Sequence, residues 1–149
     1  MIKALITKGV RADSGATAVE FGIVAPLFVL LVVGVAEVSR ALWIEEALAD
    51  AAARTARCMG LKLAGCVSSS SYSQIATKSY AQSAANTWGL KLPAGNVALE
   101  TSSSCPGQTG ETSFVTATLT YNYSTVAAAL LPGVYNINLT GSACFPQSS

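Results

Sequence analysis

The segment 14–36 is the feature that most constrains how this 149-residue chain folds. Its 23 residues are mostly apolar and hold a single ionisable side chain, Glu20. At 1.5 Å per residue they would form a helix roughly 35 Å long, enough to cross the hydrocarbon core of a bilayer. The sequence therefore predicts a single membrane span, which we assign to residues 16–36.

The charges around this segment indicate its orientation. The leader, residues 1–15, has a net charge of +2, from Lys3, Lys8, Arg11 and Asp13. The remainder of the chain is close to neutral, with six basic and seven acidic side chains. Because basic flanks stay in the cytoplasm, we expect a cytoplasmic N-terminus and an exported chain after about Glu37.

The overall composition argues against most catalytic and nucleic-acid functions. The chain contains no histidine, which excludes histidine-based triads and Cys₂His₂ zinc sites. Its formal charge of +1 gives no excess of basic groups for nucleic acid. Neither a phosphate-binding loop nor a nucleophile elbow is present. We therefore expect no enzymatic activity, no catalytic residues, no cofactor and no small-molecule substrate.

Four cysteines follow the predicted span: Cys58, Cys66, Cys105 and Cys144. An even number of cysteines in an exported segment indicates disulfides. Four cysteines allow three connectivities, among which the sequence alone does not choose, and we favour Cys58–Cys66 with Cys105–Cys144. The intervening 7, 38 and 38 residues do not match the short spacings of zinc sites, so we predict no metal.

Residues 37–60 have the spacing of an amphipathic helix. Small and apolar side chains recur every three or four residues, at Ala41, Ile44, Leu48, Ala52, Thr55 and Met59. Charged side chains fall on the opposite face, at Glu46, Asp50, Arg54 and Arg57. We expect the membrane helix to continue as a stalk that ends near Gly60, with this glycine at the C′ position. Its apolar stripe is expected to pack on the protein's own domain, and the alternative is an interface with another subunit.

The exported domain, residues 61–149, is predicted to contain a second helix and a small sheet. Ser71 and Gln74 match a capping box that opens a helical segment. Its apolar positions are Tyr72, Ile75, Ala76, Tyr80, Ala84 and Trp88. Alternating patterns predict antiparallel strands at 97–101, 115–123 and 135–140, separated by Pro-Gly pairs at 106–107 and 132–133. The expected fold class is α+β.

A short motif lies where the leader meets the span. It reads Ser14-Gly15-Ala16-Thr17-Ala18-Val19-Glu20-Phe21, a glycine followed five residues later by an acidic and then an aromatic residue. This arrangement resembles the processing site of TadE-like minor pilins of the Tad (Flp) pilus, a branch of the type IV pilin-like proteins. The resemblance extends over roughly the first 60 residues.

The resemblance implies a pilin-like fold and a structural role in pilus assembly and adhesion. It implies cleavage between Gly15 and Ala16 by a prepilin peptidase, with Glu20 and Phe21 in the processing and assembly motif. The implied partners are other pilin subunits, the assembly platform and the membrane. The precursor would lie in the inner membrane, and the mature protein in a periplasmic or extracellular pilus.

Glu20 is a charged group that the bilayer disfavours, at a cost of roughly 2.5–3.5 kcal/mol. Cleavage would create an amino group on Ala16, four residues earlier, which the Glu20 carboxylate of a neighbouring subunit could neutralise and so set their register. The alternative is that Glu20 lies at the cytoplasmic interface and extends toward water.

Pro26 is expected to distort the apolar helix. It removes one backbone donor and crowds the carbonyl of Gly22, which predicts a kink or local melting there. The alternative is an ordinary membrane helix that tolerates proline.

Two other functions compete with a pilin. One is a secreted or membrane-anchored binding module with an ordinary signal peptide cleaved near Ala36, after the small residues Gly34-Val35-Ala36. The other is a membrane-anchored enzyme that uses serine, tyrosine or carboxylate groups. Glu20 near the start of the apolar run argues against the first, and the lack of histidine against the second.

Overall fold

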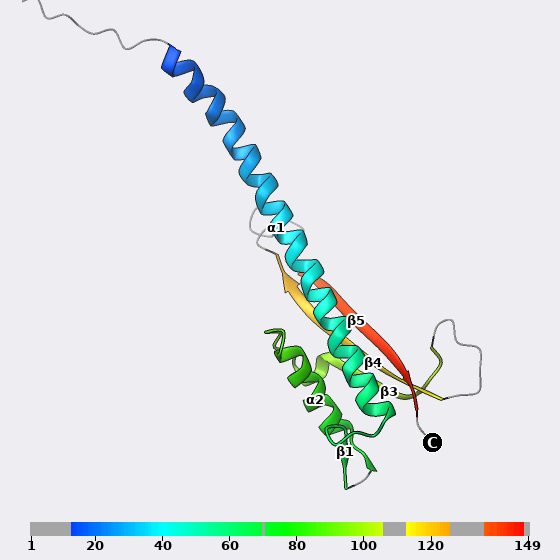
Figure 1. The fold of residues 1–149 in the computed structure, drawn as a ribbon. Coiled ribbons are helices and arrows are strands. Elements are labelled where there is room, and N and C mark those ends of the chain that lie inside the picture. The colour runs from blue at the N-terminus through cyan, green and yellow to red at the C-terminus, as the bar shows by residue number, and fades with distance from the viewer. Residues whose placement is uncertain (1–12, 70, 106–112, 126–135, 148–149) are drawn as a thin grey trace, which may run out of the picture. The chain divides into compact units, whose positions relative to one another are not determined.

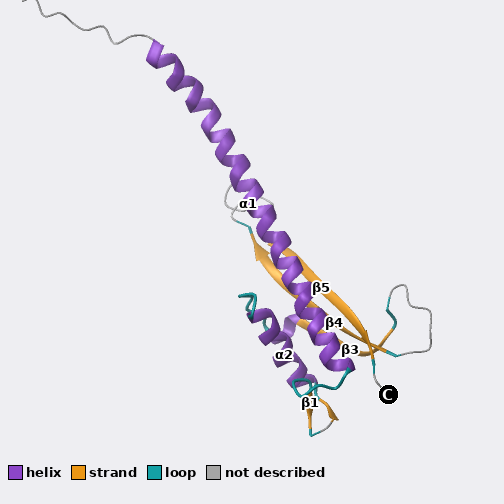
Figure 2. Cartoon of the chain, viewed as in Figure 1, coloured by secondary structure: helices purple, strands orange, loops and turns teal. Residues whose placement is uncertain are grey.

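The computed structural model describes residues 13–69, 71–105, 113–125 and 136–147 (Figure 1). The elements are α1 (Asp13–Gly60), β1 (Val67–Ser68), β2 (Ser71–Tyr72), α2 (Gln74–Asn86), the 3-10 helix η1 (Ala94–Asn96), β3 (Val97–Ser103), β4 (Phe114–Ser124) and β5 (Asn136–Pro146). Contacts divide the chain into two compact units, Met1–Ala36 and Glu37–Ser149. The predicted α+β class is confirmed (Figure 2).

Helix α1 is continuous over 48 residues, and its second half carries the core. All six positions of the predicted stripe are buried or, at Ala41, partly buried. The charged side chains at Glu46, Arg54 and Arg57 are exposed on the other face, as predicted. Three further alanines are buried, Ala47, Ala51 and Ala56, so the face against the domain is wider than the pattern indicated. The stripe therefore packs on the protein's own domain.

The end of α1 differs from the prediction at its capping residue. Lys62 adopts the left-handed conformation, with φ 52°. Its amide donates to the Met59 carbonyl, and the Leu63 amide donates to the Cys58 carbonyl, which is the Schellman pattern with Lys62 at C′. Gly60 is needed for another reason, because a Cβ there would lie 2.7 Å from the Pro146 carbonyl oxygen.

Helix α2 begins later than predicted, and only part of its predicted face is buried, with Ala84 inside and Ala76, Tyr80 and Trp88 half-buried. Ser71 and Tyr72 pair with β1 in a short hairpin, so the N-cap is Ser73, whose hydroxyl accepts from the Ala76 amide at 3.4 Å. Ile75, expected inside, is 81% exposed. The buried side chains are Thr77, Ala81, Ala84 and Ala85, small groups that allow close packing.

The three-stranded sheet is antiparallel, in the order β3-β4-β5. Strands β4 and β5 pair along their whole length, from Phe114 opposite Pro146 to Ser124 opposite Asn136. The predicted alternation in β4 is confirmed, with buried side chains at Val115, Ala117, Leu119 and Tyr123. Strand β5 runs six residues beyond the predicted end at 140. Tyr135 and both Pro-Gly pairs lie outside the described residues.

One apolar core joins the second half of α1 to α2 and to the sheet. In Figure 2 the helix α2 and the three strands lie beside the same stretch of α1. The two buried threonines are satisfied locally: Thr55 donates to the Ala51 carbonyl at 2.7 Å, and Thr77 to the Ser73 carbonyl at 2.8 Å. Polar groups therefore enter this core only with a hydrogen-bond partner.

Candidate functional site

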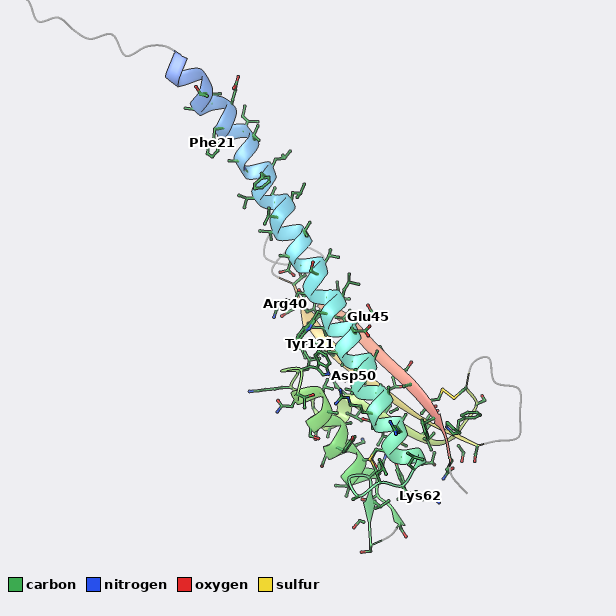
Figure 3. The ribbon with its side chains drawn as sticks, viewed as in Figure 1. Phe21, Arg40, Glu45, Asp50, Lys62 and Tyr121 are labelled. Carbon is green, nitrogen blue, oxygen red and sulfur yellow. A yellow bond between two sulfur atoms is a disulfide. The ribbon has the colours of Figure 1, made fainter. Side chains whose placement is uncertain are left out.

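The part of α1 that precedes Glu37 carries large apolar side chains along its length. Its large side chains are 37% to 74% exposed, and Figure 3 shows Phe21 extending from the ribbon. Among the described residues, α1 is the one helix long and apolar enough to cross a membrane. This is compatible with a membrane anchor.

The processing motif lies in the first turns of this helix. Gly15 is the third residue of α1 and is exposed, as are Glu20 and Phe21. The Ala16 side chain lies outside the described part of the chain. The structure thus puts the motif on one helix near its N-terminus, and the roles of these residues in processing stay predictions.

Helix α1 passes through Pro26 without interruption. The expected local melting is therefore not found, because the surrounding turns keep their helical conformation. A Cβ built on Gly22, one turn earlier, would meet no atom within 4 Å. A bend at this proline stays a prediction.

A polar cluster forms where α1 enters the second unit. The Tyr123 hydroxyl donates to Glu37 Oε2 at 2.6 Å, and the Thr125 hydroxyl donates to the same oxygen at 3.0 Å. The Arg40 guanidinium lies 5.6 Å from the centroid of the Tyr123 ring, within the range of a cation–π interaction. These hydrogen bonds connect the end of β4 to α1 just after the apolar segment 14–36.

This cluster changes the acidity of Tyr123. The hydrogen bond to Glu37 is the largest cause that raises the pKa of the Tyr123 hydroxyl, followed by burial and by the negative charge of Glu37. The Arg40 charge acts in the opposite direction. Tyr123 is therefore held neutral and serves as a donor rather than as a base.

A second polar cluster connects α1 with the end of α2. The Trp88 indole donates to Asp50 Oδ2 at 2.9 Å, and Arg54 Nε pairs with the same oxygen at 2.9 Å. The Trp88 ring also meets Trp43 edge to face, with centroids 6.2 Å apart. The Trp88 hydrogen bond, more than the Arg54 charge, lowers the pKa of the Asp50 carboxyl, against an opposing effect of desolvation. Figure 3 labels Asp50 on the stretch of α1 beside α2.

Sequence reasoning missed both clusters. Glu37 and Tyr123 are 86 positions apart, and Asp50 and Trp88 are 38 apart. No local pattern reports such a pairing. The one available signal was the position of Glu37, the first acidic residue after the apolar run, since a charge so near a membrane needs a partner.

Two depressions on the described surface do not resemble a catalytic site. One of about 500 Å³ lies beside α2 and has Lys91 as its charged group, and one of about 400 Å³ lies on the sheet and has Glu100. Neither lining offers the paired acid and base that general acid–base catalysis uses. Within the described ranges, no group of three His, Cys, Asp or Glu side chains could hold a metal ion.

Two disulfides join the four cysteines. Cys58 at the end of α1 bonds Cys66, with Cα atoms 5.9 Å apart, and Cys105 bonds Cys144 of β5, with Cα atoms 6.2 Å apart. This is the connectivity favoured from the sequence. The first closes the loop after α1, and the second ties the chain after β3 to β5.

Comparison with known proteins identifies the N-terminal segment. Residues 15–57 match the family model described as TadE-like protein. A search of curated proteins and a search of solved structures each returned no match. The matched segment begins at Gly15 and ends at Arg57 inside α1, so α2 and the sheet lie outside it.

The resemblance predicted from the motif is thereby confirmed. Over residues 15–57 the chain is similar to TadE-like proteins, which is compatible with a general role in a Tad pilus. The exposed apolar half of α1 fits the membrane anchor that such a protein has.

Proposed function

Because residues 15–57 are TadE-like, we propose that this chain is a minor pilin, or pseudopilin, that is cleaved between Gly15 and Ala16 and built into or primes a Tad-type pilus. The observation that carries the proposal is the coincidence of this match with the exposed apolar helix. The match starts at the glycine of the proposed cleavage site and covers the whole span, residues 16–36. In this role the protein supports pilus assembly and adhesion and is not an enzyme.

The precursor lies in the inner membrane with its basic leader, residues 1–15, in the cytoplasm. The domain that follows Glu37 is exported. The two disulfides support export of this domain, because thiols on the far side of the membrane meet an oxidising compartment. After cleavage the protein moves from the membrane into the periplasmic or extracellular pilus.

The prepilin peptidase is the first partner. Gly15 presents no side chain, which lets a protease approach the backbone closely. Its place in the first turn of α1 means that only the end of the helix has to open for cleavage, and helix ends open most easily.

Other pilin subunits and the assembly platform are the later partners. An apolar helix surface that leaves the bilayer needs another apolar surface to cover it, and neighbouring pilin helices provide one. In that packing the Glu20 carboxylate neutralises the Ala16 amine of a neighbour and sets the axial register. A bend near Pro26 helps the helix leave the bilayer.

The intact mass of protein recovered from membranes and from sheared pili tests the proposal. Cleavage after Gly15 removes 15 of the 149 residues and leaves a chain of 134 that begins Ala-Thr-Ala-Val-Glu. The same mass reports any methyl group on the new amine. Cells without the prepilin peptidase are the control and should retain the uncleaved precursor. A mature chain that begins at Glu37 would instead establish the signal-peptide alternative.

A further inference from the structure

The apolar surface of α1 continues past Ala36 into the second unit. Val38 is 60% exposed, Leu42 is 61% exposed and Trp43 is 49% exposed. We call these three side chains the collar. They lie on both flanks of the helix stripe that the domain covers at Ala41 and Ile44, since successive residues turn by 100° around a helix.

The charged groups at this level are arranged so that the collar stays apolar. Glu37 receives hydrogen bonds from Tyr123 and Thr125, which hold its carboxylate against the domain. Arg40 lies over the Tyr123 ring. The next acidic residue on α1 is Glu45, after the collar ends.

The collar is also close to the span along the chain. Trp43 follows Ala36 by seven residues, about 10 Å of helix. The headgroup layer on each side of a bilayer is about 5–8 Å thick, so a span that ends near Ala36 places Val38 within this layer and Leu42 and Trp43 near its outer edge. Tryptophan and tyrosine concentrate at this level in membrane proteins, and arginine extends to phosphate oxygens there.

We propose that the collar, with Ile137 of β5, is a membrane-surface contact that binds phospholipid headgroups and the adjoining acyl carbons. Ile137 is 46% exposed and shares with Val38 the wall of a cavity of about 170 Å³. The Arg40 guanidinium supplies the cation for lipid phosphate. This inference rests on the proposed function in one respect, that α1 spans the membrane. The contact keeps the exported domain on the membrane until the subunit is extracted.

Tryptophan fluorescence of the full chain in vesicles tests the contact. The chain has two tryptophans, so Trp88→Phe leaves Trp43 as the only emitter. The vesicles contain phosphatidylcholine and phosphatidylglycerol, with lipids brominated at successive depths. The matched control combines Trp43→Phe and Trp88→Phe with Ile75→Trp, which places the indole on an exposed position at the start of α2. Protease resistance in detergent confirms that each variant is folded.

We expect brominated lipids to quench Trp43, most strongly when bromine lies nearest the headgroups, and to leave the control indole unquenched. A water-soluble quencher should quench the control indole more strongly than Trp43. Val38→Gln with Leu42→Gln on the Trp88→Phe background should reduce the lipid quenching of Trp43.

Retention of the chain in vesicles after an alkaline carbonate wash reports the span independently. Retained protein whose Trp43 is quenched only from water would overturn the lipid contact and leave the membrane anchor standing. Retained protein whose Trp43 is shielded from both quenchers would make the collar a contact between subunits, which also overturns it. Loss of the chain in the wash would overturn the anchor itself.

Discussion

Gly141 of β5 lies directly against the backbone of Leu48 on α1. A Cβ added to this glycine would come within 2.5 Å of the Ala49 amide nitrogen, and backbone atoms cannot move aside as a flexible side chain can. The helix and the strand therefore meet with no side chain between them. This contact sets how closely the sheet approaches the alanine-rich face of α1.

Gly141→Ala should destabilise the domain that follows Glu37 by about 1–3 kcal/mol, the usual cost of overpacking a core. The reason is that the new methyl group would have to push β5 away from α1. Thermal unfolding in detergent micelles, followed by circular dichroism, measures the loss. Gly95→Ala is the control, because a Cβ there meets no atom within 4 Å. Equal unfolding temperatures for the two variants would contradict the close approach.

Tyr123→Phe should lower the stability by about 1.5–3 kcal/mol, because it removes a hydrogen bond to a charged group. It should also change the response to alkali. The folded-state pKa of Tyr123 is raised above the usual value of 10.0, so the unfolded chain loses this proton first. The contribution of the Tyr123 hydroxyl to stability is complete below pH 10 and disappears as the pH rises through its folded-state pKa.

The measurement for Tyr123 is thermal unfolding between pH 8 and pH 11. Tyr121→Phe deletes the same atom two residues earlier on β4 and serves as the control. The difference between wild type and Tyr123→Phe should shrink as the pH rises. A constant difference would show that the Glu37 carboxylate is not the partner that matters.

Asp50→Asn should weaken the domain at neutral pH and have less effect in acid. The pKa of the Asp50 carboxyl is lowered in the fold, so the unfolded chain takes up a proton first as the pH falls. The stabilisation is therefore present above the ordinary value of 3.8 and is lost as the pH falls through the folded-state pKa. Unfolding temperatures at pH 7 and pH 3 give the comparison. Glu46→Gln, on the exposed face of α1, is the control, and an equal pH response in both variants would argue against the Trp88 contact.

The sequence predicted those features of the fold that depend on residues close together along the chain. The burial of Leu48 and Leu119 followed from local periods of a helix and of a strand, since a regular alternation reports which face is covered. The stalk helix and the sheet were therefore predictable. A continuous apolar helix long enough to cross a bilayer was predictable, because length and apolarity are properties of one continuous segment.

The failures came from interactions between distant segments. Ser71 matched a capping box, but pairing with β1 placed it in a strand and moved the cap to Ser73. Gly60 was predicted to end the helix at the C′ position, but its lack of a side chain instead leaves room for the end of β5. Asp50 was placed on the charged face opposite the apolar stripe, but it accepts a hydrogen bond from Trp88, 38 positions later. Such contacts depend on tertiary structure, which no local window contains.

The two disulfides should contribute unequally to stability. In the loop-entropy account, a bond that closes 8 residues is worth about 2.5 kcal/mol and one that closes 39 is worth about 4 kcal/mol. Replacing Cys105 and Cys144 with serine should therefore lower the unfolding temperature more than replacing Cys58 and Cys66. Non-reducing peptide mapping of exported protein should give these two linked pairs. Alkylatable thiols at Cys105 and Cys144 would contradict the pairing.

Glu20→Ala should separate processing from assembly. We expect the variant to be inserted and cleaved, because the peptidase reads mainly the glycine and the basic leader, yet to be missing from pili. Removing the carboxylate lowers the cost of residence in the membrane but leaves the Ala16 amine of a neighbouring subunit without its partner, so the defect should appear only at subunit packing. Cells producing each variant would be compared for precursor size, membrane level and presence in the sheared pilus fraction. Gly15→Leu is the control and should accumulate as uncleaved precursor. Normal incorporation of cleaved Glu20→Ala protein would show that this carboxylate does not set the register, which leaves it a group at the cytoplasmic interface.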